Sequence, residues 1–387
     1  MDAAIARIEE LASTADENTP RELRLRLLNV VHSLEDTNDT FHRFAHCHLS
    51  SAVVKIGLDL GLFKRLTDSK GIVTLEIIAE RTGADISLLG RFMRYLACIG
   101  AVDQVSRNQF AANHTTRNLS QKVLESGISH CFEVVAPIYQ AMPSFLQETK
   151  YVTPTDPVDT AWQRAFNTPM HALEWLSRHP DKLARFGDYM ASRDGPSRGW
   201  LDVYPVQEEL ATRDWEEGTT QAVFVNVGVG FGHPCAEFKK KFPHVPGRVV
   251  LQDLPPMIEQ VPQVPGVENM AHNLFDEQPV KGAKYYFMRA ILHNHPDHLA
   301  KVLLERVRDA MAPDSVLLLD DYVVSEQWPD FFSRSISDLT MLGTFSSQER
   351  FEEQWCSLFG SVGLRLVKSY PLNKPPTSET VMEVRLK

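Results

Sequence analysis

The sequence predicts two parts of different fold class: an α-helical N-terminal half that contains a winged-helix subdomain, and a C-terminal α/β Rossmann-like domain. In the first half, apolar residues recur at helical spacing, and a pair of helices runs into a short alternating ribbon. In the second half, apolar strand-like runs alternate with helical sequence, which indicates a parallel sheet. We expect a helical dimerisation and winged-helix domain over 1–120, a helical pocket and linker region over 121–218, and the α/β domain over 219–387.

The composition narrows the class of protein. The chain has 387 residues and a formal net charge of -10, with acids and bases interspersed, which disfavours nucleic acid as a partner. Five scattered cysteines without a CxxC pair are typical of reduced thiols, so we expect a cytoplasmic protein without a zinc site. The N-terminus has no long apolar core, and no run of eighteen apolar residues occurs, so we expect neither a signal peptide nor a membrane span.

The first helices follow from apolar spacing over residues 2–34, interrupted where Thr19 and Pro20 fit a helix start. A third helix is expected over 48–66, with Gly61 as its closing residue. These segments carry no catalytic motif. They favour a packing role.

A winged helix is expected next along the chain. Residues 74–102 predict two helices joined at 82–84, and residues 102–113 alternate like a hairpin with its turn near Asn108. The second helix opens with Asp85, Ile86 and Ser87, so it lacks the basic face that DNA recognition needs. We therefore favour packing and dimerisation over DNA binding.

The region 121–218 is rich in aromatic residues at helical spacing. They are Phe132, Tyr139, Phe145, Trp162, Phe166, Trp175, Phe186, Tyr189 and Trp200. Such residues are usually core, but their density is equally compatible with the wall of a pocket for a flat apolar ligand. Residues 151–159, with two prolines, read as a loop between helices.

Four strands are expected in the C-terminal domain, over 222–232, 247–255, 283–292 and 315–324. The first runs into Gly228, Gly230 and Gly232, which open a helix where backbone N–H groups can approach a ligand. Asp253 ends the second strand, where a carboxylate can accept both ribose hydroxyls of an adenine nucleoside. Because no second mononucleotide half follows and GxGxxG is incomplete, we favour S-adenosylmethionine over NAD. A plain strand–helix turn is the alternative.

Six stretches carry a family resemblance over essentially the whole chain. They are WLDVYP (200–205), VGVGFGH (227–233), FPHVPGRVVLQDLP (242–255), YYFMRAILHNHPD (285–297), LLLDD (317–321) and DLTMLGTFSSQERFEEQW (338–355). The sequence resembles the fungal S-adenosylmethionine-dependent O-methyltransferases, which are related to the plant caffeate-type enzymes. This resemblance implies a class I methyltransferase domain and a homodimer with interlocked N-terminal helices.

The resemblance also implies catalytic roles. His293 falls where the family keeps a general base, and a histidine suits that role because its pKa lies near the working pH. Asp321 and Glu349 match the acidic residues that orient and charge-stabilise it. The implied reaction is methyl transfer to a phenol or enol hydroxyl of an aromatic or polyketide-like small molecule.

The departures from the family pattern favour an alternative. Asn226 replaces an acid and Val229 a glycine, His293-Asn294-His295 stands where the family reads HDW, and Phe351 replaces a threonine. A branch of the family resembles the methyltransferases in fold but consists of pericyclases, which bind the cofactor without consuming it and steer dehydrations and cycloadditions.

In that alternative, His130 matches a pocket histidine of the branch, and His130, His293 and Arg193 would donate hydrogen bonds to a conjugated carbonyl. Phe41, Phe132, Phe186 and Asn294 would shape the substrate pocket. A helix cap is the other reading of His130. A third hypothesis, a non-catalytic dimeric regulator, is disfavoured by the intact glycines and Asp253.

His42 and His46 would share one helix face, which is compatible with a metal ion. No third ligand follows at a suitable interval, so we expect no metal.

Overall fold

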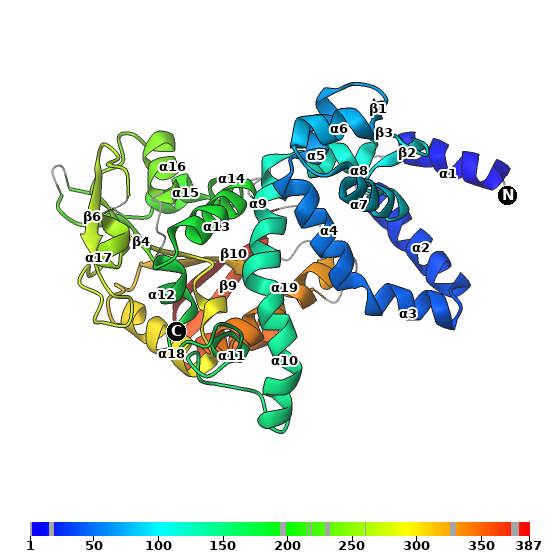
Figure 1. Cartoon of the computed structure of the whole chain (residues 1–387). Helices are drawn as coiled ribbons and strands as arrows, with labels where there is room; N and C mark the ends of the chain where they lie inside the picture. The colour runs from blue at the N-terminus through cyan, green and yellow to red at the C-terminus, as the bar shows by residue number, and fades with distance from the viewer. Residues whose placement is uncertain are drawn as a thin grey trace. The chain divides into compact units, whose positions relative to one another are not determined.

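The computed structural model describes residues 2–14, 19–193, 199–213, 215–216, 219–228, 233–259, 261–325, 330–372 and 379–387. The chain divides into two compact units (Figure 1). Unit 1 comprises Met1–Gln140 and Leu173–Gly195, and unit 2 comprises Ala141–Ala172 and Pro196–Lys387. The segment from 121 to 218 thus contributes to both units.

Unit 1 begins with five helices. They are α1 (Asp2–Thr14), α2 (Thr19–Leu34), α3 (Thr37–Ala45), α4 (Cys47–Asp59) and α5 (Leu62–Asp68). The predicted helix closes at Gly61 as expected, with φ +62° there, and the residues after it form a separate helix, α5, that was not predicted. A left-handed residue cannot continue a right-handed helix, and glycine adopts that conformation without a side-chain clash.

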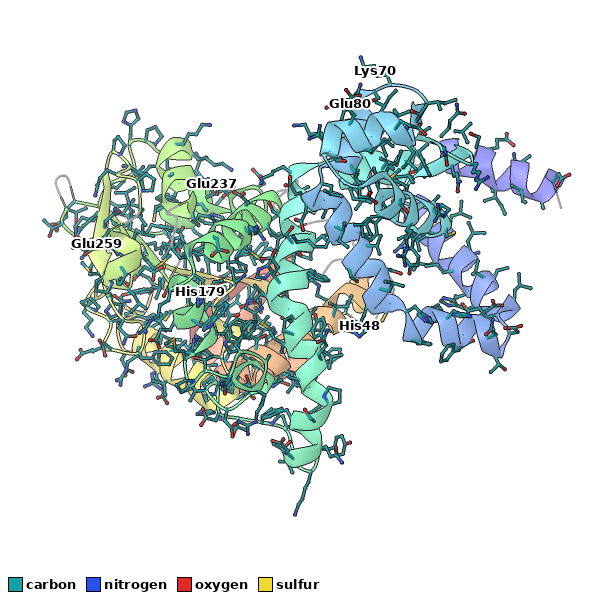
Figure 2. All side chains as sticks on the ribbon, in the orientation of Figure 1. His48, Lys70, Glu80, His179, Glu237 and Glu259 are labelled. Carbon is teal, nitrogen blue, oxygen red and sulfur yellow. The ribbon has the colours of Figure 1, made fainter. Side chains whose placement is uncertain are left out.

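The winged-helix prediction is confirmed. Its elements are β1 (Val73–Thr74), α6 (Leu75–Thr82), α7 (Ile86–Cys98), β2 (Asp103–Ser106) and β3 (Gln109–Ala111), with sheet order β1-β3-β2. Thr74 and Asp85 accept backbone N–H bonds at the starts of α6 and α7, and Gly83 ends α6. Exposed Lys70 and Glu80 on this subdomain are labelled in Figure 2.

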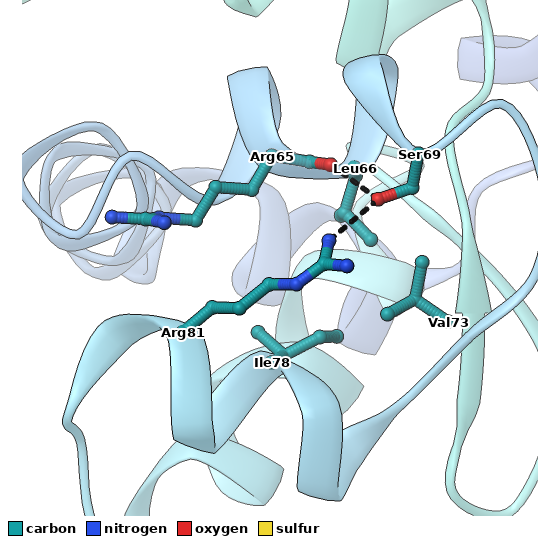
Figure 3. A pocket seen from close by; sticks show the side chains of 6 residues that line it. All are labelled: Arg65, Leu66, Ser69, Val73, Ile78 and Arg81. Atoms are coloured by element: carbon teal, nitrogen blue, oxygen red, sulfur yellow. Dashed lines mark hydrogen bonds between the residues drawn. The ribbon is translucent and has the colours of Figure 1, made fainter.

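A small cavity lies in this subdomain (Figure 3). Arg81 Nη1 donates to Ser69 Oγ at 3.0 Å, and that hydroxyl donates to the carbonyl oxygen of Arg65 at 2.7 Å. The cavity volume is about 10 Å³. This is room for about one water molecule, so the cavity cannot hold a substrate.

The later helices of unit 1 include an irregular segment. They are α8 (His114–Leu119), α9 (Lys122–His130), the π-helical turn η1 (Cys131–Val135), α10 (Ala136–Glu148), which continues into unit 2, α12 (Ala172–Ser177) and α13 (Pro180–Arg193). Helix α13 packs along α9. Turns of π-helix are rare, occur mostly inside α-helices, and are frequent at functional sites. Nothing in the amino-acid pattern predicts this one.

Unit 2 is built on a seven-stranded sheet of order β6-β5-β4-β7-β8-β10-β9. The strands are β4 (Ala222–Val227), β5 (Arg248–Asp253), β6 (Val267–Ala271), β7 (Tyr285–Arg289), β8 (Val316–Tyr322), β9 (Leu364–Pro371) and β10 (Glu379–Leu386). The four predicted parallel strands are confirmed, and β9 and β10 add an antiparallel pair at the other side of β8. Strand β6 was not predicted, because VENMA lacks an apolar run.

The remaining helices of unit 2 are α11 (Ala161–Phe166), α14 (Trp200–Val203), α15 (Val206–Leu210), α16 (His233–Lys241), α17 (Pro255–Ile258), α18 (Asp297–Arg308), α19 (Asp330–Phe345) and α20 (Glu352–Ser361). Successive strand residues enter different hydrophobic clusters. Phe224 packs with Trp200 and Phe238, whereas Val225 packs with Leu303 and other residues of α18 and α20. Both faces of the sheet are therefore covered, as expected for parallel strands.

Among the described residues, no helix has the length and apolar character that crossing a membrane requires.

Candidate functional site

His293 lies on a tight turn just beyond the carboxyl end of β7. The 3₁₀ turn η2 spans Leu292–Asn294, and His293 is 9% exposed. Before it, Ala290 adopts φ +51°, a strained conformation for a residue with a Cβ. Its N–H donates to Asp320 O, and its carbonyl oxygen accepts from Asn294 Nδ2, both at 2.9 Å. Asn294 thus stabilises the turn that carries His293.

Glu349 is the acidic neighbour of His293. Its Oε1 lies 3.3 Å from His293 Nδ1 and accepts a 2.5 Å hydrogen bond from Ser337 Oγ. Burial alone would raise the pKa of Glu349, but the hydrogen bonds from His293 and Ser337 and the nearby charges lower it below its usual value. Glu349 is therefore held ionised beside the imidazole.

Asp321 is the second acid of the site, at the end of β8. It is buried, and its Oδ1 accepts the backbone N–H of Tyr322 at 2.9 Å. Burial raises the pKa of Asp321, and the charge of Glu349 raises it further. The two carboxyl groups thus have pKa values pushed apart, the arrangement that separates acid and base roles in active sites.

His293, Asp321 and Glu349 each place one nitrogen or oxygen atom within 4.8 Å of the others. No other trio of potential metal ligands comes together in the described part of the chain. In this trio, His293 Nδ1 faces a carboxylate oxygen that also accepts from Ser337, so hydrogen bonds already use these atoms. His42 Nδ1 lies 3.3 Å from His46 Nδ1 on α3 and its end, as the sequence spacing suggests.

The predicted cofactor residues lie at the ends of β4 and β5. Gly228 has φ +78°, and a Cβ there would come within 3.1 Å of both Ile291 and Leu274. Gly230 and Gly232 fall outside the described residues. Asp253 ends β5, where burial raises the pKa of its carboxyl group.

Asn226 lies at the same end of β4 and is fully buried. Its side chain hydrogen-bonds the buried thiol of Cys235, and this contact opposes the rise that burial causes in the pKa of that thiol. Because β4, β5, β7 and β8 are parallel, Asn226, Asp253, Asp321 and the His293 turn share one edge of the sheet.

His130 belongs to unit 1, at the last position of α9 before the π turn. It is 8% exposed, and its ring centroid lies 5.1 Å from that of Phe186 and 6.1 Å from that of Tyr189. Burial lowers the pKa of His130 to about 4, although the charge of Glu133 opposes this. Its Nδ1 is buried and has no hydrogen-bond partner among the described residues.

The other predicted pocket residues of unit 1 are in different environments. Phe132 and Phe186 are partly buried, on the π turn and on α13. Phe41 is exposed on α3 and makes edge contacts with His42 and His46. The side chain of Arg193 lies outside the described part of the structure. The structure thus brings Phe186, but not Phe41, into contact with His130.

Three residues around His293 were not predicted from the sequence. Ser337 and Asp338 on α19 bind the side chain and the backbone N–H of Glu349, and Arg350 contacts the backbone of the His293 turn. Ser337 carries no local motif, whereas Asp338 begins the stretch 338–355 that carries the family resemblance. Arg350 had one available signal, because it follows Glu349 directly in the QERF segment.

Comparisons with known proteins agree with this arrangement. Residues 206–365 match the family model of the O-methyltransferase domain, and residues 42–126 match that of the O-methyltransferase dimerisation domain. The O-methyltransferase lepI of Aspergillus flavus is 35% identical over 371 residues, which cover 95% of each chain.

Solved structures give the same result. One described as a pericyclic reaction enzyme has a TM-score of 0.86 and 34% identity, covering 100% of this chain and 99% of that one. A structure of LepI in complex with SAM has the same score and identity, covering 100% and 98% of the two chains. The chain therefore belongs to the O-methyltransferase family.

Proposed function

We propose that this protein binds S-adenosylmethionine at the carboxyl ends of β4 and β5 and transfers its methyl group to a hydroxyl of an aromatic or polyketide-like small molecule. The observation that carries this proposal is the buried contact of His293 Nδ1 with Glu349 Oε1, at the sheet edge that also carries Asp253. A histidine paired with a buried carboxylate is the arrangement that a general base requires. Membership of the O-methyltransferase family supports the same reaction.

The residues at this edge fit the cofactor. Asp253 offers a carboxylate for the ribose hydroxyls, and the left-handed backbone of Gly228 turns the chain at the end of β4 without a side chain. Gly230 and Gly232 would complete the backbone cradle. The structure of LepI with SAM supports this assignment. When bound, S-adenosylmethionine supplies an electrophilic methyl group.

His293 would act on the acceptor hydroxyl. With Nδ1 directed to Glu349, proton transfer would take place at Nε2. The imidazole accepts the hydroxyl proton as the oxygen bonds to the methyl carbon and the carbon–sulfur bond breaks. Ionised Glu349 stabilises the resulting imidazolium, and Ser337 orients Glu349. The products are the methyl ether, S-adenosylhomocysteine and a proton held on His293.

We further propose a cytoplasmic homodimer with interlocked N-terminal helices. The dimerisation-domain match over 42–126 supports a dimer. Large apolar side chains are exposed on α2 and α3, including Leu34 at 77%, Phe44 at 66% and Phe41 at 58%. Burying such side chains against a second copy would be favourable. Phe41 would then shape the pocket through this interface.

A pericyclic reaction is the second candidate, favoured by the neutral, buried His130 and by the likeness to the pericyclic reaction enzyme at 34% identity. In this reaction, a donor among His130, His293 and Arg193 would hydrogen-bond a conjugated carbonyl of the substrate. The cofactor would be bound and not consumed.

One experiment separates the two. Purified protein is incubated with S-adenosylmethionine and a panel of phenolic and pyridone polyketides, and mass spectrometry follows the small molecules and S-adenosylhomocysteine. A gain of one methyl group with matching S-adenosylhomocysteine establishes methyl transfer. An isomerised or dehydrated product without S-adenosylhomocysteine establishes the pericyclic reaction and overturns our first proposal. Absence of cofactor binding would overturn both and favour a non-catalytic regulator.

A further inference from the structure

Arg350 has a fully buried guanidinium that contacts the chain on both sides of His293. Nη1 donates to the carbonyl oxygen of Leu292 at 3.0 Å, and Nη2 donates to that of His295 at 2.8 Å. Nε and Nη2 also donate to Asp297 Oδ1, at 3.0 and 2.8 Å. The side chain of Arg350 is 0% exposed, so water does not compete for these bonds.

The accepting carbonyls belong to the residue before His293 and to the second residue after it. They bracket the 3₁₀ turn η2. A turn held at both ends fixes the backbone of His293, and a fixed backbone limits the positions that the imidazole can occupy. The backbone of this turn is strained at Ala290, and strained turns persist only where their surroundings hold them.

Arg350 is itself anchored to the sheet. Its carbonyl oxygen accepts the N–H of Val324 at 2.9 Å, just beyond β8. Its guanidinium lies over the ring of Trp355, with 5.0 Å to the centroid, and Trp355 Nε1 donates to the carbonyl oxygen of Tyr322. The ring of Tyr322 meets that of His293 edge-on, with 5.7 Å between centroids. The guanidinium therefore links the end of β8 to the His293 turn.

The neighbouring residue in the sequence acts on the same histidine. Glu349 contacts the imidazole, and Arg350 contacts the backbone of the same turn. Two consecutive residues thus hold His293. Glu349 contacts the side chain of His293, and the guanidinium of Arg350 contacts the backbone on either side of it.

We propose that Arg350 is a positioning residue that sets the orientation of the His293 imidazole toward Glu349. Its effect on turnover rests on the proposed function of His293 as general base, whereas its effect on the imidazole does not. Arginine is required because its rigid fork reaches two carbonyls and a carboxylate in one plane. Lysine keeps the charge but has a single nitrogen, so Arg350→Lys cannot make all these bonds.

The test compares Arg350→Lys with Gln348→Ala, a control two residues away. Among the described residues, Gln348 makes long hydrogen bonds of 3.4 Å, to Asp297 and Gln354. Thermal unfolding and calorimetric binding of S-adenosylhomocysteine show whether each variant folds and binds cofactor. The readouts are kcat and KM separately, the pH–rate profile, and a pH titration of the imidazole by NMR with ¹³C-labelled histidine, assigned with His293→Gln.

We expect Arg350→Lys to bind the cofactor, to lose about 100-fold in kcat with little change in KM, and to shift the NMR titration of His293. Gln348→Ala should resemble the wild type in all readouts. An Arg350→Lys protein with wild-type kcat, pH profile and His293 titration would overturn the proposal.

A second variant keeps the proposal testable if Arg350→Lys does not fold. If Arg350→Lys does not fold, Asp297→Asn keeps an acceptor oxygen at a half-exposed position and weakens the hold on Arg350. It should shift the His293 titration and lower kcat by a smaller factor, and an unchanged titration and kcat would overturn the proposal. His293→Ala is measured in parallel. If it keeps full turnover, the proposed base is wrong, and the NMR titration alone decides the role of Arg350.

Discussion

His130 and His293 are buried to nearly the same degree, at 8% and 9% exposure, yet their surroundings differ. His130 precedes a π turn in unit 1, and its neighbours are the rings of Phe186 and Tyr189. His293 lies on a 3₁₀ turn in unit 2, with the carboxylate of Glu349 at its Nδ1. His130 thus ends a regular α-helix and His293 lies on a tight turn, and of the two only His293 has an acid in hydrogen-bond contact.

The difference in surroundings favours different chemical roles for the two histidines in our proposals. Burial without a contacting acid lowers the pKa of His130 to about 4, so its ring is neutral at pH 7 and can only exchange hydrogen bonds. An ionised carboxylate stabilises a positive imidazole, so His293 can accept a proton. The following predictions test this contrast, from the largest expected effect to the smallest.

Replacing each histidine in turn should distinguish their roles in turnover most clearly. We expect His293→Ala to reduce methyl transfer by about 10²- to 10⁴-fold, because the general base is lost. The exposed His244→Ala is the control and should keep wild-type turnover. Production of S-adenosylhomocysteine measures the effect. Wild-type activity in His293→Ala together with a large loss in His130→Ala would reverse the assignment.

The acid stability of the protein should depend on His130. Because its pKa is lowered from 6.5 to about 4, the folded state binds this proton more weakly than the unfolded chain. The neutral His130 ring therefore makes its full contribution to the free energy of unfolding above pH 6.5. This contribution falls by roughly 3 kcal/mol as the pH decreases toward 4. His130→Leu should abolish this component, seen as a smaller difference between urea unfolding at pH 7 and at pH 4. Identical pH dependence in both proteins would contradict the assignment.

Substitutions at two glycines test the packing of the Tyr189 ring, which lies beside His130. A Cβ on Gly127 would lie 2.8 Å from the ring of Tyr189, whereas nothing lies within 4 Å of a Cβ on Gly187. We expect Gly127→Ala to lower the free energy of unfolding by about 1–3 kcal/mol through overpacking. Gly187→Ala, on α13, should raise it by about 0.5–1 kcal/mol, because alanine favours helix. Chemical denaturation measures both, and equal effects would show that Tyr189 yields easily.

A substitution of Asp321 tests the ionisation of the second acid near His293. Its raised pKa means that the folded state loses stability as the pH rises above the pKa of the unfolded carboxyl, near 3.9. Asp321→Asn should therefore increase the melting temperature at pH 7 by about 2–4 °C, an effect of about 1 kcal/mol that shrinks toward pH 4.

Asp320→Asn is the matched control for this prediction. Asp320 Oδ2 pairs with Arg289 Nε at 3.1 Å, so this change should lower the melting temperature. If both substitutions lowered the melting temperature equally at pH 7, the ionisation we assign to Asp321 would be incorrect.

Local patterns predicted much of this fold. Thr74, Gly83 and Asp85 mark helix ends in the sequence and occupy them in the structure. Apolar runs predicted the central strands, because a parallel sheet buries both faces. Strand β6 and the separate helix α5 escaped prediction, since pairing with β5 and a single left-handed glycine decide them.

The surroundings of the two histidines are harder to predict. Ser337 contacts Glu349 across a sequence separation of 12 residues, and Arg350 contacts Leu292 across a separation of 58. No local pattern encodes such contacts. The π turn after His130 likewise depends on the packing of α9 against α13.

The placement of β10 has a consequence for biosynthesis. This strand pairs with β8 on one side and β9 on the other, although it follows both along the chain. While the polypeptide emerges from the ribosome, the apolar strand Val316–Tyr322 therefore has one unpaired edge until residues 379–386 are made. Such an edge invites aggregation of the nascent chain. The strand that carries Asp321 is thus open to pairing with another chain until β10 covers its edge.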